Sequence, residues 1–124
     1  MTKIIKLVEK IIDMTKENVI EWVEGSDSSR PFSQFFTHTF RVKFYPSIKL
    51  SGNAVRYLGP REIVFLNSKG EIITSVTENY SDEAAILLNI LQEKIMTQKE
   101  HKIDNEIDKI SREIEEIPLS KVPF

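Results

Sequence analysis

The sequence predicts an α+β fold: an antiparallel β-meander of about four to five strands, flanked by N-terminal and C-terminal helices, with a long C-terminal helical extension. Apolar residues recur at helical spacing near both ends of the chain. Between these two regions, alternation of apolar and polar residues and clusters of turn residues indicate short strands joined by hairpins. With 124 residues and 40% hydrophobic content, the chain is long enough for one domain with a real core.

The first helix is expected over residues 3–23, with Gly25 as its C-terminal cap. Lysines and acidic residues occupy the opposite side of this helix, so it should cover a core with one wide stripe. That stripe consists of Ile4, Ile5, Val8, Ile11, Ile12, Thr15, Val19 and Trp22. Because Trp22 is the last residue of this stripe, just before Gly25, we expect it to be buried where the helix meets the sheet.

The first strand is expected within residues 36–44, after a loop over residues 26–31. The residues on one side of this strand are Phe36, His38, Phe40, Val42 and Phe44. Those on the other side are Thr37, Thr39, Arg41 and Lys43. This period of two is typical of a half-buried strand.

Shorter strands are expected at 48–50 and 55–58, followed by strands at 62–66 and 71–76. Gly70 should occupy the left-handed position of the hairpin loop that joins the last two strands. Sequential hairpins of this kind predict an antiparallel meander that leaves one face available for helices.

The second helix should begin after Ser81, which is suited to cap it, and continue to about residue 117. No glycine or proline interrupts residues 82–117, and the apolar face changes phase across the polar stretch 97–102. The first half should therefore pack on the sheet while the second half projects past it. This reading divides the chain into an α+β sandwich domain (1–96), a helical extension that could form a coiled coil (97–117) and a short tail (118–124).

The segments "IVFLNSKGEIITSV" and "YSDEAAILLNILQEKI" follow a helix that ends near a tryptophan and a strand rich in phenylalanine. This order of elements resembles a scattered group of small bacterial domains, over roughly residues 3–96. The resemblance implies a helix, sheet, helix sandwich, and it implies no activity, cofactor or site residues.

The predicted extension carries an isoleucine seam, which consists of Ile103, Ile107, Ile110, Ile114 and Ile117. Their spacing of four, three, four and three places them on one narrow face, and Pro118 follows as a stop. The intervening residues are polar, as in a coiled-coil strand, and isoleucine at both core positions favours three or four parallel strands over two. We expect the seam to mediate self-association or to dock a helical protein partner. The alternative is that the extension folds back over its own sheet.

The second feature that suggests a function is a stretch without acidic residues, from 28 to 61. Its cations include four candidate anion-binding residues, Arg41, Lys43, Lys49 and Arg56, together with Arg30 and Arg61. Cations interleaved with aromatic residues are typical of surfaces that bind single-stranded nucleic acid or another anionic partner. However, the period of two points most of these rings inward, and the net charge of −2 is unlike that of most nucleic-acid-binding domains.

No motif for catalysis, metal binding or a cofactor is present. The chain has no cysteine, His38 and His101 have no second histidine at ligand spacing, and the four glycines match no phosphate-binding loop. We therefore expect a non-enzymatic protein without metal or cofactor. The charged N-terminal helix is unlike a signal peptide or a membrane span, which favours a cytoplasmic location. A third possibility is a small molecule bound between helix and sheet, but the sequence does not indicate the class of molecule.

Overall fold

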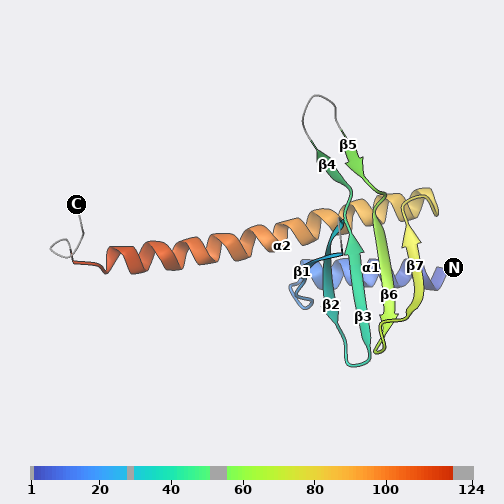
Figure 1. Ribbon diagram of the computed structural model, residues 1–124, viewed down its shortest axis with the longest axis horizontal. Helices are drawn as coiled ribbons and strands as arrows, with labels where there is room; N and C mark the ends of the chain where they lie inside the picture. The colour runs from blue at the N-terminus through green and yellow to red at the C-terminus, as the bar shows by residue number, and fades with distance from the viewer. Residues whose placement is uncertain (1, 28–29, 51–55, 119–124) are drawn as a thin grey trace.

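The computed structural model describes residues 2–27, 30–50 and 56–118 (Figure 1). It contains two helices and seven strands in these parts of the chain. In chain order the elements are α1 (Thr2–Lys16), β1 (Val23–Asp27), β2 (Arg30–Phe36), β3 (Phe40–Tyr45), β4 (Ile48–Leu50), β5 (Arg56–Leu58), β6 (Glu62–Asn67), β7 (Ile72–Thr77) and α2 (Asp82–Glu115).

Five of the strands form one antiparallel sheet in the order β1-β2-β3-β6-β7. Strands β4 and β5 pair only with each other and form a hairpin inserted between β3 and β6. Across the centre of the sheet, Val42 pairs with Phe35 and Phe65, while Phe44 pairs with Ile63. The predicted α+β fold with an antiparallel meander is thus confirmed.

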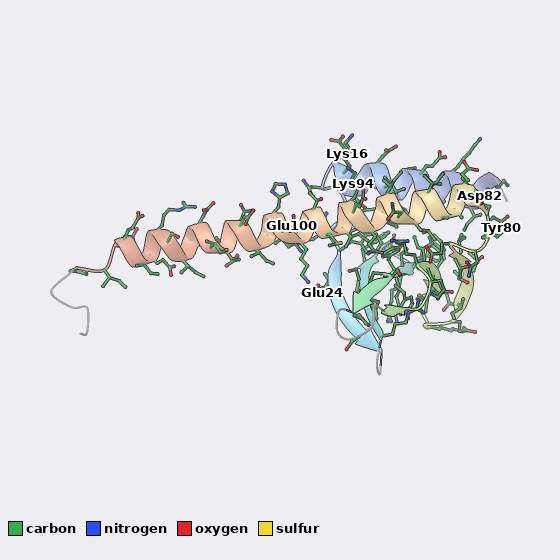
Figure 2. The ribbon with its side chains drawn as sticks, turned by 90° about the horizontal axis from the view of Figure 1, so that it is seen from above. Lys16, Glu24, Tyr80, Asp82, Lys94 and Glu100 are labelled. Carbon is green, nitrogen blue, oxygen red and sulfur yellow. The ribbon has the colours of Figure 1, made fainter. Side chains whose placement is uncertain are left out.

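Both helices lie on the same face of the sheet, where they pack side by side (Figures 1 and 2). One core cluster joins residues of both helices to one side of the sheet. Its members are Ile5, Val8, Ile11, Ile12, Ile20, Trp22, Phe35, Val42, Phe44, Ile63, Phe65, Val76, Ala84, Leu88, Leu91 and Ile95. The fold therefore has two layers, and the expected helix, sheet, helix sandwich is wrong. The outer face mixes charged residues such as Arg41 and Lys43 with apolar ones such as Val64 and Leu66, and neither described helix packs on it (Figure 2).

Helix α1 is shorter than predicted, because it ends at Lys16 and not near residue 23. Asn18 has a φ of 58°, in the left-handed region that asparagine tolerates better than most residues, and the chain turns there. As a result Val19 is 67% exposed and Ile20 is buried. Gly25 does not cap this helix and instead lies in the middle of β1.

A hairpin, β2–β3, replaces the single strand predicted over residues 36–44. Residues 37–39 form its turn, in which the hydroxyl of Thr37 accepts a hydrogen bond of 3.0 Å from the backbone N–H of Phe40. Only the β3 part keeps the predicted alternation, with Val42 and Phe44 buried. The sequence pattern does not predict strands β1 and β2, because their residues do not alternate between apolar and polar. Gly70, with a φ of 82°, takes the left-handed position predicted for it in the turn between β6 and β7.

Helix α2 runs without a break for 34 residues, about 51 Å at 1.5 Å per residue. The side chain of Ser81 caps its first turn, as predicted, by accepting a hydrogen bond of 3.0 Å from the N–H of Ala84. The helix packs on the sheet through Ala84, Leu88, Leu91, Ile95 and Gln98. Its second half then projects beyond the sheet (Figure 1).

The two halves of α2 present different faces. The buried positions are four, three, four and three residues apart, and the same spacing continued into the second half reaches Lys102, Asn105, Lys109 and Arg112, which are polar. The isoleucine seam lies one or two residues beyond these polar positions, and at 3.6 residues per turn its average direction is about 100° around the helix from that of the buried residues. The seam therefore faces to one side of the domain core and not toward it.

Candidate functional site

The base of the projecting helix is fixed by the side chain of Gln98, which is buried. Its amide donates a hydrogen bond of 2.7 Å to the carbonyl of Ile20, and its oxygen accepts one of 2.9 Å from the N–H of Trp22. The indole N–H of Trp22 donates to the hydroxyl of Thr15 at 2.9 Å, and the ring meets Phe35 edge-on. Trp22 is buried, as predicted, although it lies in the segment before β1 and not in a helix.

Two lysines add ion pairs next to this junction. Lys99 pairs with Glu24, and the ammonium of Lys102 lies 2.8 Å from a carboxylate oxygen of Glu21. The hydrogen bond from Lys102 and its positive charge lower the pKa of the Glu21 carboxyl below its ordinary value. Within the described parts of the chain, no hydrogen bond or ion pair joins α2 to the rest of the domain beyond Lys102.

The isoleucine seam begins immediately after this last attachment. Its five residues are between 48% and 60% exposed, so none of them packs into the core. Helix α2 reaches Glu115, and the N–H of Ile117 still donates to the carbonyl of Ile114 in a final turn before Pro118. The alternative in which this segment folds back over its own sheet is therefore wrong.

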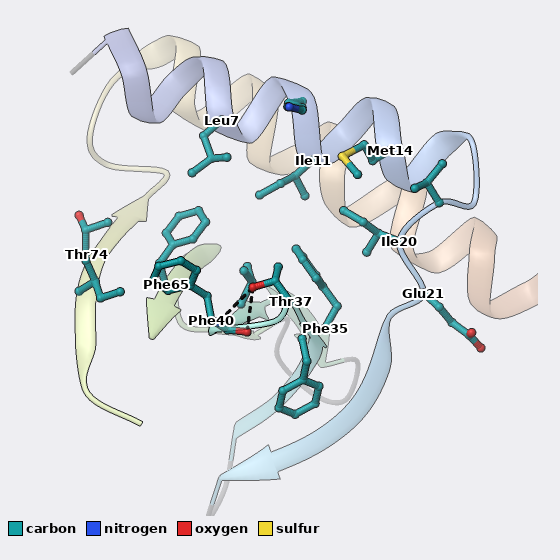
Figure 3. A pocket seen from close by; sticks show the side chains of 15 residues that line it. Leu7, Ile11, Met14, Ile20, Glu21, Phe35, Thr37, Phe40, Phe65 and Thr74 are labelled. Atoms are coloured by element: carbon teal, nitrogen blue, oxygen red, sulfur yellow. Dashed lines mark hydrogen bonds between the residues drawn. The ribbon is translucent and has the colours of Figure 1, made fainter. Parts of the chain in front are cut away.

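A large apolar groove of about 820 Å³ lies between α1 and the sheet (Figure 3). Buried residues form its floor, including Ile11, Phe35 and Phe65. Leu7 on α1 and Phe40 on β3 line its sides and remain partly exposed. The sequence pattern could not indicate this groove, because it depends on where α1 ends and on the turn at residues 37–39.

The outer face of the sheet brings together two of the four candidate anion-binding residues. The ammonium of Lys43 lies 4.4 Å from the centre of the Phe32 ring, and the guanidinium of Arg41 lies 5.4 Å from the centre of the Phe36 ring. Lys49 and Arg56 lie in β4 and β5, and their side chains are outside the described part of the structure.

The rings on this outer face correct the expectation that most aromatic residues point inward. Phe35 and Phe44 belong to the core, but Phe32, Phe36 and Tyr45 contact cations on the outer face. Thr37 and Thr39, expected on the polar side of a strand, lie in the turn of the hairpin.

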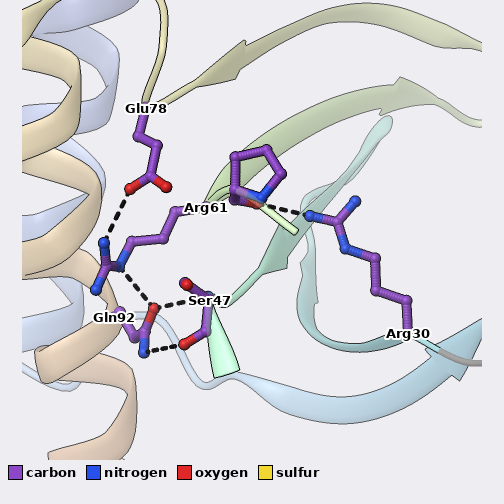
Figure 4. A network of polar contacts seen from close by, with 6 residues as sticks. Arg30, Ser47, Arg61, Glu78 and Gln92 are labelled. Atoms are coloured by element: carbon purple, nitrogen blue, oxygen red, sulfur yellow. Dashed lines mark hydrogen bonds and ion pairs between the residues drawn. The ribbon is translucent and has the colours of Figure 1, made fainter. Parts of the chain in front are cut away.

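The other two cations of the acid-free stretch are held in structural contacts. The guanidinium of Arg61 donates to Gln92 at 2.8 Å and to Glu78 at 2.9 Å (Figure 4). The amide of Gln92 also exchanges two hydrogen bonds of 3.1 Å with the backbone of Ser47, which ties the start of the β4–β5 hairpin to α2. Arg30 donates to the carbonyl of Pro60 at 2.7 Å and lies over the ring of Tyr45.

Neither histidine belongs to a candidate metal site, since both are exposed and the described residues contain no group of three or more histidine or acidic side chains that could hold a metal ion. Neither described helix is long and apolar enough to cross a membrane. Comparison with protein-family models, curated proteins and solved structures finds no significant match for this chain.

Proposed function

We propose that the chain is a non-enzymatic interaction module that self-associates through the isoleucine seam of α2. The observation that carries this proposal is a row of five isoleucines at coiled-coil spacing, all about half exposed, on a helix segment that leaves its own domain. An apolar row of this length on a projecting helix is typical of an interaction surface. Its direction, about 100° away from the core-facing side, leaves room for a second helix beside it.

The charges next to the seam favour a second copy in parallel orientation. With Ile107 and Ile114 at a-type positions, Lys99 takes a g position and Asp104 an e position. A parallel neighbour brings Asp104 near Lys99, which already pairs with Glu24 of its own chain, and it creates no contact between like charges. An antiparallel neighbour that aligns the isoleucines brings Glu106 opposite Glu113, which is repulsive. Isoleucine at both core positions favours a trimer or tetramer of parallel helices.

The test is the mass in solution of the double variant Ile107→Asp, Ile114→Asp, measured by light scattering. We expect the wild-type chain to form oligomers at high micromolar concentration and the variant to be monomeric with an unchanged circular dichroism spectrum. The matched control, Asn105→Asp with Arg112→Asp, puts two aspartates at the same seven-residue spacing on the polar face and should leave the oligomer intact. A monomeric wild-type chain, or a variant that unfolds, would contradict the proposal.

A second candidate function is the binding of an anionic partner, such as single-stranded nucleic acid, at the outer face of the sheet. Arg41 beside the exposed ring of Phe36 favours it, because a cation next to an accessible ring suits a phosphate and its base. Binding to a single-stranded oligonucleotide should weaken steeply between roughly 50 and 200 mM salt. Arg41→Gln with Lys43→Gln should reduce that salt slope, and Lys16→Gln on α1 should not. Absence of binding at low salt would remove this candidate.

A further inference from the structure

The groove between α1 and the sheet has the size of a ligand site. Its volume of about 820 Å³ falls within the range of roughly 300–1,000 Å³ that is usual for pockets that bind small molecules. Such pockets are mostly apolar with a few polar groups that fix the orientation of the ligand. The groove fits this description, because its lining is dominated by aliphatic and aromatic side chains.

The apolar side chains of the groove come from opposite walls and remain accessible. Leu7 on α1 is 41% exposed, Phe40 at the start of β3 is 48% exposed, and Ile73 on β7 is 53% exposed. Figure 3 shows Leu7, Ile11 and Met14 above the space and Phe40 and Phe65 below it. These residues form one concave patch from several elements, unlike single apolar residues scattered over a surface.

Among the few polar residues that line the groove, Lys10 is the one charged residue without a partner in the described structure. The hydroxyl of Thr37 is bonded to the backbone of Phe40, and the carboxylate of Glu21 is paired with Lys102. Lys10 also lines the groove, and it forms no ion pair with any residue that the structure describes. A ligand in the groove would therefore meet apolar walls, the hydroxyl of Thr74 and a single available positive charge.

We propose that this groove binds an amphipathic anion of the fatty-carboxylate class. The hydrocarbon chain lies against Ile11, Phe35 and Phe65, and the carboxylate pairs with the ammonium of Lys10. A neutral apolar molecule would use only the first set of contacts, and a cationic amphipath would be repelled by Lys10. This site is separate from the isoleucine seam and does not depend on self-association.

The test is titration with dodecanoate below its micelle concentration, in the Ile107→Asp, Ile114→Asp background so that association through the seam does not contribute. Emission of Trp22 reports on the groove, because its ring packs 4.7 Å from that of Phe35, which lines it. Lys10→Glu should weaken dodecanoate binding about tenfold or more and leave dodecanol binding unchanged. The matched control is Lys6→Glu, an exposed position on the same helix that does not line the groove.

A second pair of variants tests the apolar wall. Ile73→Asp should abolish binding of both dodecanoate and dodecanol, while Ile86→Asp, at an exposed position on α2 outside the groove, should not. Failure of dodecanoate to bind, or equal weakening by Lys10→Glu and Lys6→Glu, would overturn the proposal. A residual dimer in the seam-variant background that Ile73→Asp dissociates would also overturn it, since the groove would then be covered by a second copy.

Discussion

At Gly25 the backbone of β1 lies directly against the aromatic ring of Phe32, its cross-strand partner in β2. A β-carbon at this position would lie 2.7 Å from the nearest ring atom, closer than two carbon atoms can pack without a shift. The glycine therefore lets the ring of Phe32 lie flat on the edge strand, where it is buried although it is not part of the main core. A close approach of this kind is one of the few reasons for glycine within a strand.

Gly25→Ala should destabilise the domain by about 1–3 kcal/mol, the usual cost of inserting a methyl group into a packed site. The free energy of unfolding in urea measures this effect. Ser26→Ala changes an exposed neighbour in the same strand and should alter the stability far less. Equal stability of the two variants would mean that Phe32 moves aside without cost.

Single residues also explain where the sequence predictions succeeded and failed. The burial of Trp22 was predicted from a helical stripe that continues through Val19, yet the helix ends before both residues. The left-handed turn at Asn18 is tolerated by asparagine but not required by it, so no pattern could place the end of α1 there. Gly25 fits a helix cap as well as a strand contact, and only the position of Phe32 distinguishes these two roles.

Among the elements, α2 was predicted most accurately because its local signals agree with one another. Ser81 is a strong cap, and glycine and proline are absent until Pro118. The β2–β3 hairpin was missed because the alternation of apolar and polar residues runs straight through the turn at residues 37–39. The path of the chain there is decided by pairing with β6, a contact between residues distant in the sequence.

The attachment of α2 to the segment before β1 has a measurable pH signature. In the variant Lys102→Met, the pKa of the Glu21 carboxyl should rise back to its ordinary value of about 4.5, because the hydrogen bond and the positive charge of Lys102 are lost. In the wild-type chain this pair stabilises the fold fully above pH 4.5, and the contribution disappears as the pH falls through the lower pKa of the folded state.

An NMR titration of the side-chain carbonyl of Glu21 measures this pKa directly. Lys109→Met is a suitable control, since Lys109 pairs with Glu106 within α2 and makes no contact with Glu21. An unchanged Glu21 pKa in Lys102→Met would show that the ion pair does not form in solution.

For the whole molecule, the core and the proposed association surface occupy separate parts of the chain. Every residue of the core cluster precedes Gln98, and every residue of the isoleucine seam follows Lys102. The seam was predictable from its spacing alone, because a helix places residues four and three apart on one face. The groove was not predictable, since it arises from the placement of α1 against four different strands, β2, β3, β6 and β7.

Deletion of residues 103–124 should therefore leave a folded domain. Its melting temperature should match that of the monomeric Ile107→Asp, Ile114→Asp chain, because oligomers gain concentration-dependent stability that would confuse a comparison with the wild-type protein. Differential scanning calorimetry at two protein concentrations measures this. Loss of the cooperative unfolding transition in the deletion variant would mean that the projecting half of α2 contributes to the fold.

Helix α2 is continuous from the core to the seam. The number of residues between Gln98 and Ile103 therefore determines how each domain is oriented relative to the seam. In an assembly built on the seam, one residue added or removed there would turn each domain by about 100° around the assembly axis and shift it by about 1.5 Å along that axis. A loop at the same place would absorb such a change, but a continuous helix transmits it. The length of this helical segment thus determines the rotation of each domain about the assembly axis, and hence which of its surfaces faces the neighbouring domains.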